Sequence, residues 1–411
     1  MAIATDEIQA DLSQTINAGS REGYHTTRHL EHASKQAVDR RYEDFLIVDA
    51  DAHHYENENW ADIVKYIEEP VLRHQAEYGI QNGGRNVLVG TSSGNQPMSG
   101  RVTRYAGRRH EKTDGEPDRT IALARREMDA IGIDYQVLFP TPMLELGMHP
   151  DPLMEVPISW AYSRWLTEEV LVHDPRVKTL VYLPFNDPDA SVRTVEYFSD
   201  KPGVVGFMVT SARYRCVHDN AYMKLYRMLE ERELPLCFHP VFHQQERIFS
   251  GMNRFISVHA LGFILYNMVH LINMVINGIP ERFPNLKIIW IENGLAWLPF
   301  LMQRLDNEYL MRTSEAPLLK KKPSEYMKQF FYTSQPMETD NLEALELTMK
   351  MINAETQLLF ASDYPHWDFN LPSTIYDLPF LSEQAKRNIL GENSRKLFKL
   401  DGKPVKPAFA A

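Results

Sequence analysis

Three apolar runs of the chain end in side chains that commonly bind metal ions. Asp51 and His53 close the first run, His239 closes the second, and Asp363 lies near the end of the third. Asp51 and His53 are two residues apart, so on a β-strand both point to the same face. Two imidazoles and two carboxylates brought together predict a catalytic metal site, in which some coordination positions stay open for water or substrate.

The elements that must position these side chains follow from the spacing of apolar residues. Eight short, nearly continuous apolar runs are typical of parallel strands buried on both faces; they span 45–53, 135–141, 178–184, 204–210, 234–240, 286–294, 331–336 and 358–366. Helical patterns lie between several of them, at 121–131, 221–232 and 263–283. This alternation predicts an α/β fold, a (β/α)8 TIM barrel, whose strand ends gather catalytic residues on one face. An open doubly wound sheet is the alternative, but no glycine-rich phosphate loop follows the first run.

We expect the barrel to occupy residues 45–400, with an N-terminal helical arm at 1–44 and a C-terminal tail at 401–411. The segment 80–117 is rich in Gly, Ser, Asn and Arg, and it predicts a long insertion that forms a lid over the barrel mouth. The arginines of this insertion are either ordinary surface residues or partners for a substrate carboxylate; they are Arg101, Arg104, Arg108 and Arg109.

The arm carries three histidines at helical spacing, His25, His29 and His32. They could hold a metal ion, but no acidic or cysteine ligand accompanies them. A solvated or partner-contacting arm is therefore the favoured interpretation.

Composition excludes several classes of protein. The chain has 411 residues, of which 44% are hydrophobic, and its formal net charge is −11. A negative field disfavours nucleic acid and anionic membranes as partners. No apolar run reaches the roughly 18 residues of a membrane span, and the first residues lack the pattern of a signal peptide. Only Cys216 and Cys237 are cysteines, which predicts a reduced, cytoplasmic protein.

Five motifs give the chain a resemblance to a known family. It resembles the amidohydrolase-related proteins of the aminocarboxymuconate-semialdehyde decarboxylase type, in the metal-dependent amidohydrolase superfamily. The resemblance covers about 45–400 and implies a (β/α)8 barrel with a divalent metal ion, held by Asp51, His53, His239 and Asp363. The motifs that carry it are 48–53, 237–240, 277–288, 292–299 with 304–306, and 361–366.

Glu292 departs from the pattern of that family. The related decarboxylases place an acid/base histidine at the end of the sixth strand, and here the matching residue is Glu292. Glu292 could act as a general base if burial raises its pKa, or it could bind metal. His366, which follows Asp363, is the second candidate catalytic residue.

Surplus histidines near the predicted site suggest a second metal ion. Its candidate ligands are Glu292, His54, His243, His259 and His270. His259 and His270 are eleven residues apart, about 16 Å along a helix, so both cannot bind one ion unless the helix is broken. Trp297, Tyr364 and Trp367 are expected to line the pocket or to pack in the core.

The preferred hypothesis is an O₂-activating monooxygenase or hydroxylase with a dinuclear Fe or Mn centre, which needs an external reductant. One alternative is a mononuclear Zn or Mn hydrolase or decarboxylase. A second alternative is a non-catalytic partner subunit of a hetero-oligomer. In the enzymatic readings the substrate is a small polar molecule, a carboxylate or amino acid, and we expect a homo- or hetero-oligomer.

Overall fold

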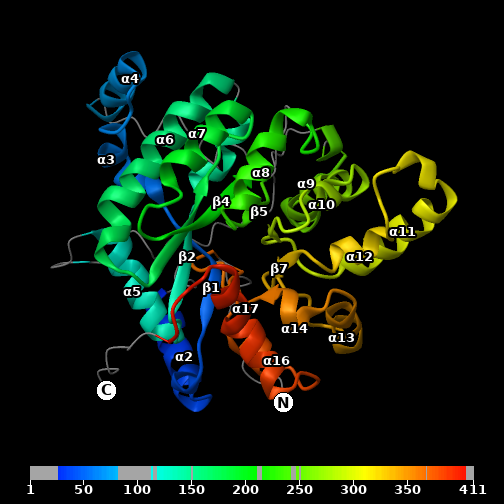
Figure 1. Cartoon of the computed structure of the whole chain (residues 1–411). Helices are drawn as coiled ribbons and strands as arrows, with labels where there is room; N and C mark the ends of the chain where they lie inside the picture. The colour runs from blue at the N-terminus through cyan, green and yellow to red at the C-terminus, as the bar shows by residue number, and fades with distance from the viewer. Residues whose placement is uncertain are drawn as a thin grey trace.

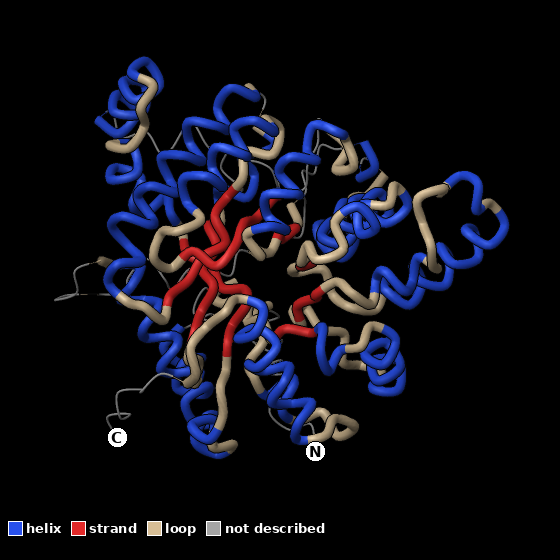
Figure 2. Tube along the Cα trace, in the orientation of Figure 1, coloured by secondary structure: helices blue, strands red, loops and turns tan. Residues whose placement is uncertain are grey.

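The fold is a barrel of parallel strands surrounded by helices. The computed structural model describes residues 26–81, 113, 118–149, 151–210, 215–241, 247–249, 251–366 and 368–403. Eight parallel strands follow one another around the sheet in chain order, and Figure 2 shows them in red at the centre with the helices outside. They are β1 Val48–His54, β2 Tyr135–Pro140, β3 Val177–Tyr182, β4 Val204–Thr210, β5 Leu236–His239, β6 Ile288–Trp290, β7 Phe331–Thr333 and β8 Leu358–Leu359.

The predicted (β/α)8 barrel is confirmed. Each strand lies within its predicted run or extends one residue beyond it, and the strand residues are almost all buried. Strands β1 to β8 pair in sequence, from Val48 opposite Tyr135 to Thr333 opposite Leu359. Near-continuous apolar runs form parallel strands because helices cover one face of the sheet and the barrel interior covers the other.

Backbone hydrogen bonds between β1 and the segment after β8 close the barrel. The Ala50 N–H donates to the Phe360 carbonyl at 2.9 Å, and the Asp363 N–H donates to the Asp51 carbonyl at 2.7 Å. These bonds lie beyond the two residues of β8 itself, so the last predicted run, 358–366, continues as irregular chain along β1.

The helices lie on the outside of the barrel (Figure 1). Helix α5 illustrates why they form where they do: the Asp118 side chain caps its first turn, and Gly132 ends it with φ of 88°, where a side chain would be strained. The helices are α2 Thr26–Asp39, α3 Trp60–Val64, α4 Pro70–Gln81, α5 Arg119–Ile131, α6 Glu155–Trp165, α7 Pro188–Phe198, α8 Met223–Glu231, α9 Phe255–Ile276, α10 Ile279–Arg282, α11 Trp297–Met311, α12 Pro323–Met327, α13 Leu342–Met351, α14 Ala354–Gln357, α15 Ser373–Tyr376, α16 Glu383–Arg387 and α17 Asn393–Leu397.

The position of helix α2 differs from the expected solvated or partner-contacting arm over the part of residues 1–44 that the structure describes. Leu30, Ala33 and Ala37 of α2 are buried and belong to the main hydrophobic core. Arg40, just after the helix, pairs with Asp377 at 2.6 Å. Residues 26–44 are therefore packed against the barrel, because the apolar residues of α2 recur at helical spacing and face it.

Helix α9 is longer than the predicted helix at its start and ends earlier. It begins at Phe255, and Gly278, with φ of 67°, separates it from α10. Its segment Ile256–Ile276 is long and apolar enough to cross a membrane by length and composition alone, with 33% of the apolar window buried in the protein. One such helix is weak evidence for a membrane, since core helices of soluble proteins share these properties.

Candidate metal centre

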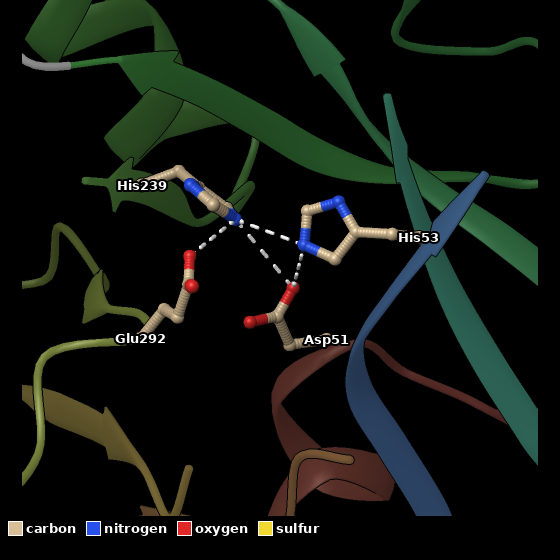
Figure 3. Close-up of side chains that lie close together, drawn as sticks. All are labelled: Asp51, His53, His239 and Glu292. Atoms are coloured by element: carbon tan, nitrogen blue, oxygen red, sulfur yellow. Dashed lines mark hydrogen bonds and ion pairs between the residues drawn. The ribbon is translucent and has the colours of Figure 1, made fainter. Parts of the chain in front are cut away.

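Five side chains from four strands or the segments that follow them converge at one end of the barrel. Asp51 and His53 lie on β1, His239 ends β5, Glu292 follows β6, and Asp363 follows β8. All five are buried, with Glu292 the most exposed at 5%. Figure 3 shows four of them, with the carboxylates and imidazoles of Asp51, His53, His239 and Glu292 turned toward one another. The parallel topology brings these distant residues together, as expected for the mouth of a barrel.

The ligand atoms of this cluster lie close to one another. The Nε2 atom of His53 is 3.3 Å from Asp51 Oδ1, 3.2 Å from Asp363 Oδ1 and 3.3 Å from His239 Nε2. The Nε2 atom of His239 is 3.5 Å from Glu292 Oε2. Ligand atoms of Asp51, His53, His239 and Glu292 all lie within 4.8 Å of one another. Such spacing leaves room for one ion among them.

Backbone carbonyls set the orientation of both imidazoles. The Nδ1 atom of His53 is 3.0 Å from the Pro140 carbonyl oxygen, and Nδ1 of His239 is 3.0 Å from that of Pro240. A carbonyl only accepts, so each Nδ1 carries the proton and each Nε2 presents a lone pair to the cluster. Two lone pairs facing each other require a cation or a proton between them. This is the orientation of histidines that bind a metal ion.

Several carboxylate oxygens of the cluster are buried and accept no hydrogen bond. They are both oxygens of Asp51, Oδ2 of Asp363 and Oε2 of Glu292. Burying an ionised carboxylate without a partner costs several kcal/mol, so such groups are paired, protonated or bound to metal. Mixed imidazole and carboxylate donors suit Mn, Fe and Zn. The residues present therefore fit a divalent metal ion.

The electrostatics of the cluster agree with a site that a cation completes. Burial, and then repulsion from Asp363 and Asp51, raise the pKa of Glu292 well above its ordinary value. Burial also raises the pKa of Asp363, although attraction to His53 opposes this. Burial lowers the pKa of His53, and repulsion from His366 adds to the effect, so this imidazole is neutral. Neutral imidazole is the form that binds metal, and a cation has to displace protons from the carboxyl groups.

Glu292 points into the site because its own backbone is left-handed. Trp290 stacks on Phe238, which lies on the face of the sheet opposite to that of His239. On a regular strand Glu292 would share the face of Trp290 and point outward. Instead Glu292 has φ of 53°, and its backbone N–H donates to Thr333 Oγ1 at 3.0 Å. The turn ends β6 and brings the carboxyl group next to His239.

His366 is positioned against a predicted metal ligand. Its Nδ1 lies 2.7 Å from Asp363 Oδ1, and its Nε2 lies 3.4 Å from Thr141 Oγ1. Its ring centroid is 4.2 Å from that of His53. Sequence reasoning missed Thr141, whose only signal is its place at the end of the second apolar run. His366 orients Asp363 by a hydrogen bond and lies at the edge of the site.

The geometry favours one metal ion over two. The described residues form a second group of potential ligands, His53, Asp363 and His366, which shares His53 with the first. The Nδ1 atom of His53 is engaged by a carbonyl, so only Nε2 is available. One imidazole nitrogen has one lone pair and binds one ion. The two groups therefore cannot each hold an ion with all of their members.

His54 is not part of that site, contrary to its proposed role as a second-metal ligand. It directly follows His53, so its side chain faces the other side of the strand. Its Nε2 lies 2.8 Å from the Tyr162 hydroxyl, and its ring stacks on Trp165 with centroids 6.0 Å apart.

His259 and His270, two further proposed second-metal ligands, do not reach the site either. The His270 ring lies 6.0 Å from Phe238, on the outer face of the sheet. His259 lies in α9 with its ring 4.9 Å from Phe263. Neither belongs to a group of potential metal ligands that the described residues form. His243 lies outside the described residues.

Four other residues singled out in the sequence pack within the fold, and the remaining ones lie outside the described ranges. His29 packs near Phe369, and His32 bonds Gln36 within α2. Trp297 donates to the Gly294 carbonyl and is buried with Tyr364 in the main core. Residues outside the described ranges are His25, Arg101, Arg104, Arg108, Arg109 and Trp367.

A family model identifies the class of protein to which the chain belongs. The Amidohydrolase family model matches residues 48–400. The chain therefore belongs to the amidohydrolase family, and the resemblance that its motifs carry is confirmed.

Two similar proteins of known activity are decarboxylases. The gamma-resorcylate decarboxylase of a Rhizobium species is 26% identical over 289 residues, 67% of this chain and 86% of that protein. The 2-amino-3-carboxymuconate-6-semialdehyde decarboxylase of Dictyostelium discoideum is 21% identical over 281 residues, 67% of this chain and 76% of that protein.

Solved structures share the fold. An amidohydrolase from Mycobacterium avium subsp. paratuberculosis superimposes with a TM-score of 0.66 at 18% identity, covering 86% of this chain and 99% of that one. A 5-carboxyvanillate decarboxylase from Novosphingobium aromaticivorans, crystallised with manganese and a nitrobenzoic acid, gives 0.64 at 20% identity, covering 87% and 96%. At these identities the likeness concerns the fold.

Proposed function

We propose that this chain is a metal-dependent decarboxylase that releases CO₂ from a small aromatic or conjugated carboxylate. The observation that carries the proposal is a buried cluster in which Asp51, His53, His239 and Glu292 place ligand atoms within 4.8 Å of one another. Asp363 adjoins this cluster, with its Oδ1 atom 3.2 Å from Nε2 of His53. The similar proteins are named for decarboxylation of gamma-resorcylate and of a carboxymuconate semialdehyde. Manganese is the preferred ion, because three of the similar structures are named with bound manganese.

The residues of the chain divide the reaction between binding and proton transfer. Asp51, His53, His239 and Asp363 would hold a divalent ion, whose positive charge would bind and orient the anionic substrate. Glu292, whose carboxyl group is buried beside His239, donates the proton. As the carbon–carboxylate bond breaks, its electron pair stays on the substrate carbon, which takes the proton from Glu292. CO₂ leaves, and Glu292 regains a proton from water.

The observations favour this reaction over the oxygenase that sequence reasoning preferred. The oxygenase needs two metal ions, O₂ and a reductant, but the two groups of described ligands share His53 and cannot both hold an ion with all of their members. The two relatives of known activity described above are both named as decarboxylases. The complete set of ligands also disfavours a non-catalytic partner subunit. The oligomeric state and the cytoplasmic location stay predictions.

Release of labelled CO₂ tests the proposed function. Protein loaded with manganese is incubated in D₂O with carboxyl-¹³C-labelled 2,6-dihydroxybenzoate, 5-carboxyvanillate and benzoate. We expect ¹³C-bicarbonate from a hydroxylated ring, one deuterium at the carbon that lost its carboxyl group, and no release after chelation. Metal-dependent O₂ consumption with a hydroxylated product, or no ¹³C release from any hydroxylated carboxylate, would contradict the proposal.

A further inference from the structure

A buried carboxyl group that is not among the predicted metal ligands links the first strand of the barrel to the segment after the last strand. Asp49 lies on β1, is 0% exposed and accepts hydrogen bonds from the Ser362 N–H at 2.8 Å and the Ser362 hydroxyl at 2.5 Å. The two residues are 313 positions apart in the chain. Asp49 also accepts the backbone N–H of Asp51 at 3.2 Å. We call this pair the Asp49–Ser362 clamp.

The clamp holds the backbone on both sides of Asp363. The Ser362 hydroxyl donates to Asp49 and accepts the Tyr364 N–H at 3.0 Å. Asp363 lies between these bonds with φ of 59°. This left-handed conformation is unfavourable in free energy for any residue other than glycine. Its own N–H donates to the Asp51 carbonyl at 2.7 Å. The surrounding bonds thus impose the conformation of Asp363.

Both neighbours of the clamp are predicted metal ligands. Asp51 is two residues after Asp49, and Asp363 is the residue after Ser362. Asp51 lies on the first strand and Asp363 follows the last strand. The distance between these two ligands therefore depends on the hydrogen bonds that join β1 to the segment after β8. Metal ligands must be held to within about 0.5 Å of the productive geometry, and neighbouring hydrogen bonds usually supply this precision.

Asp49 is not itself a candidate ligand. Its oxygens already accept three donors, and it belongs to neither group of potential ligands among the described residues. Its contacts go to the backbone and side chain that carry the ligands. Its role is therefore exerted through other residues.

We propose that Asp49 and Ser362 are positioning residues, which hold Asp51 and Asp363 at the separation that one divalent ion requires. This inference rests on the metal site of the proposed function. It makes metal affinity depend on a hydroxyl that does not touch the ion.

Manganese binding to clamp variants tests the inference. The Kd for Mn²⁺ is measured on the full chain by electron paramagnetic resonance, which separates free from bound Mn²⁺ and records the spectrum of the bound ion. We expect Ser362→Ala to weaken binding by about 10- to 100-fold and to change the bound spectrum. Ser362→Thr, which keeps the hydroxyl, restores tight binding. Asp49→Asn is expected to weaken binding further; if it does not fold, Ser362→Ala still decides.

Ser334→Ala is the matched control. Ser334 is also 0% exposed, follows the neighbouring strand, and accepts a backbone N–H, that of Ala361, at 3.1 Å. It makes no hydrogen bond to Asp49, so its loss should leave the Kd unchanged. Equal Kd values for wild type, Ser362→Ala and Ser334→Ala would overturn the clamp alone. A wild-type chain that binds no Mn²⁺ would overturn both the clamp and the proposed function.

Discussion

At the scale of single residues, the site depends on two carboxylates held in left-handed backbone. Glu292 and Asp363 have φ of 53° and 59°. Such conformations cost about 1–3 kcal/mol each in residues with side chains, and they persist where the surrounding bonds impose them. Here the Thr333 hydroxyl and the Asp51 carbonyl accept their backbone N–H groups. The left-handed backbone at each residue directs its carboxyl group toward the imidazoles.

Replacing Glu292 by glutamine separates the two roles open to it. The amide keeps the size of the side chain but cannot donate a carboxyl proton. If Glu292 is the proton donor, kcat should fall by about 10²- to 10⁴-fold while the metal content stays unchanged. Steady-state kinetics and elemental mass spectrometry on the same preparation measure both. Loss of the metal ion together with activity would make Glu292 a ligand instead.

The alternation of side chains along the strands predicted part of this site. It did not predict the direction of the side chains that lie beyond the strand ends. Asp51, His53 and His239 could be found from apolar runs and alternation. His54 faces the other side because it is one residue out of phase. Glu292 could be placed only by resemblance, since its left-handed turn reverses the face that alternation predicts. No local signal distinguishes such a residue in the sequence.

At the scale of elements, the strands were predictable because each is an apolar run bounded by polar residues. The helices α5 and α8 were also predicted to within two residues at each end, whereas α9 begins and ends about two turns before its predicted range. The packing of α2 was not, because polar residues surround its short apolar stripe. The lid predicted at 80–117 lies almost wholly outside the described residues.

Helix α6 begins with a buried carboxyl group that makes stability depend on pH. Burial raises the pKa of Glu155 to about 7, against hydrogen bonds from Asn186 and Tyr182. The folded chain therefore keeps a proton that the unfolded chain loses near its ordinary pKa of 4.5. The free energy of unfolding falls as pH rises through this window, by about 3 kcal/mol for this group.

Glu155→Gln tests this effect, because the amide is neutral at all pH values and still accepts the Tyr182 hydroxyl. Urea unfolding at pH 5 and pH 8 should show a smaller loss of stability for the variant than for wild type. Glu196→Gln, at an exposed position of α7, is the matched control and should behave as wild type. Equal pH dependence in Glu155→Gln and wild type would show that Glu155 is ionised in the fold.

At the scale of the whole molecule, closure of the barrel is what creates the site. Asp51 and Asp363 meet only because the segment after β8 returns to β1. The barrel itself could be predicted from eight runs, but the number of metal ions could not, since a count of histidines ignores which face each occupies. In the structure, His53 belongs to both groups of ligands, and this favours a single ion.

Metal content per chain tests the central claim most directly. Protein produced with Fe, Mn and Zn all supplied is measured by elemental mass spectrometry, beside His53→Ala and the matched neighbour His54→Asn. The account predicts about one divalent ion per chain in wild type and His54→Asn, and none in His53→Ala. About two ions per chain in wild type, or full retention in His53→Ala, would contradict it.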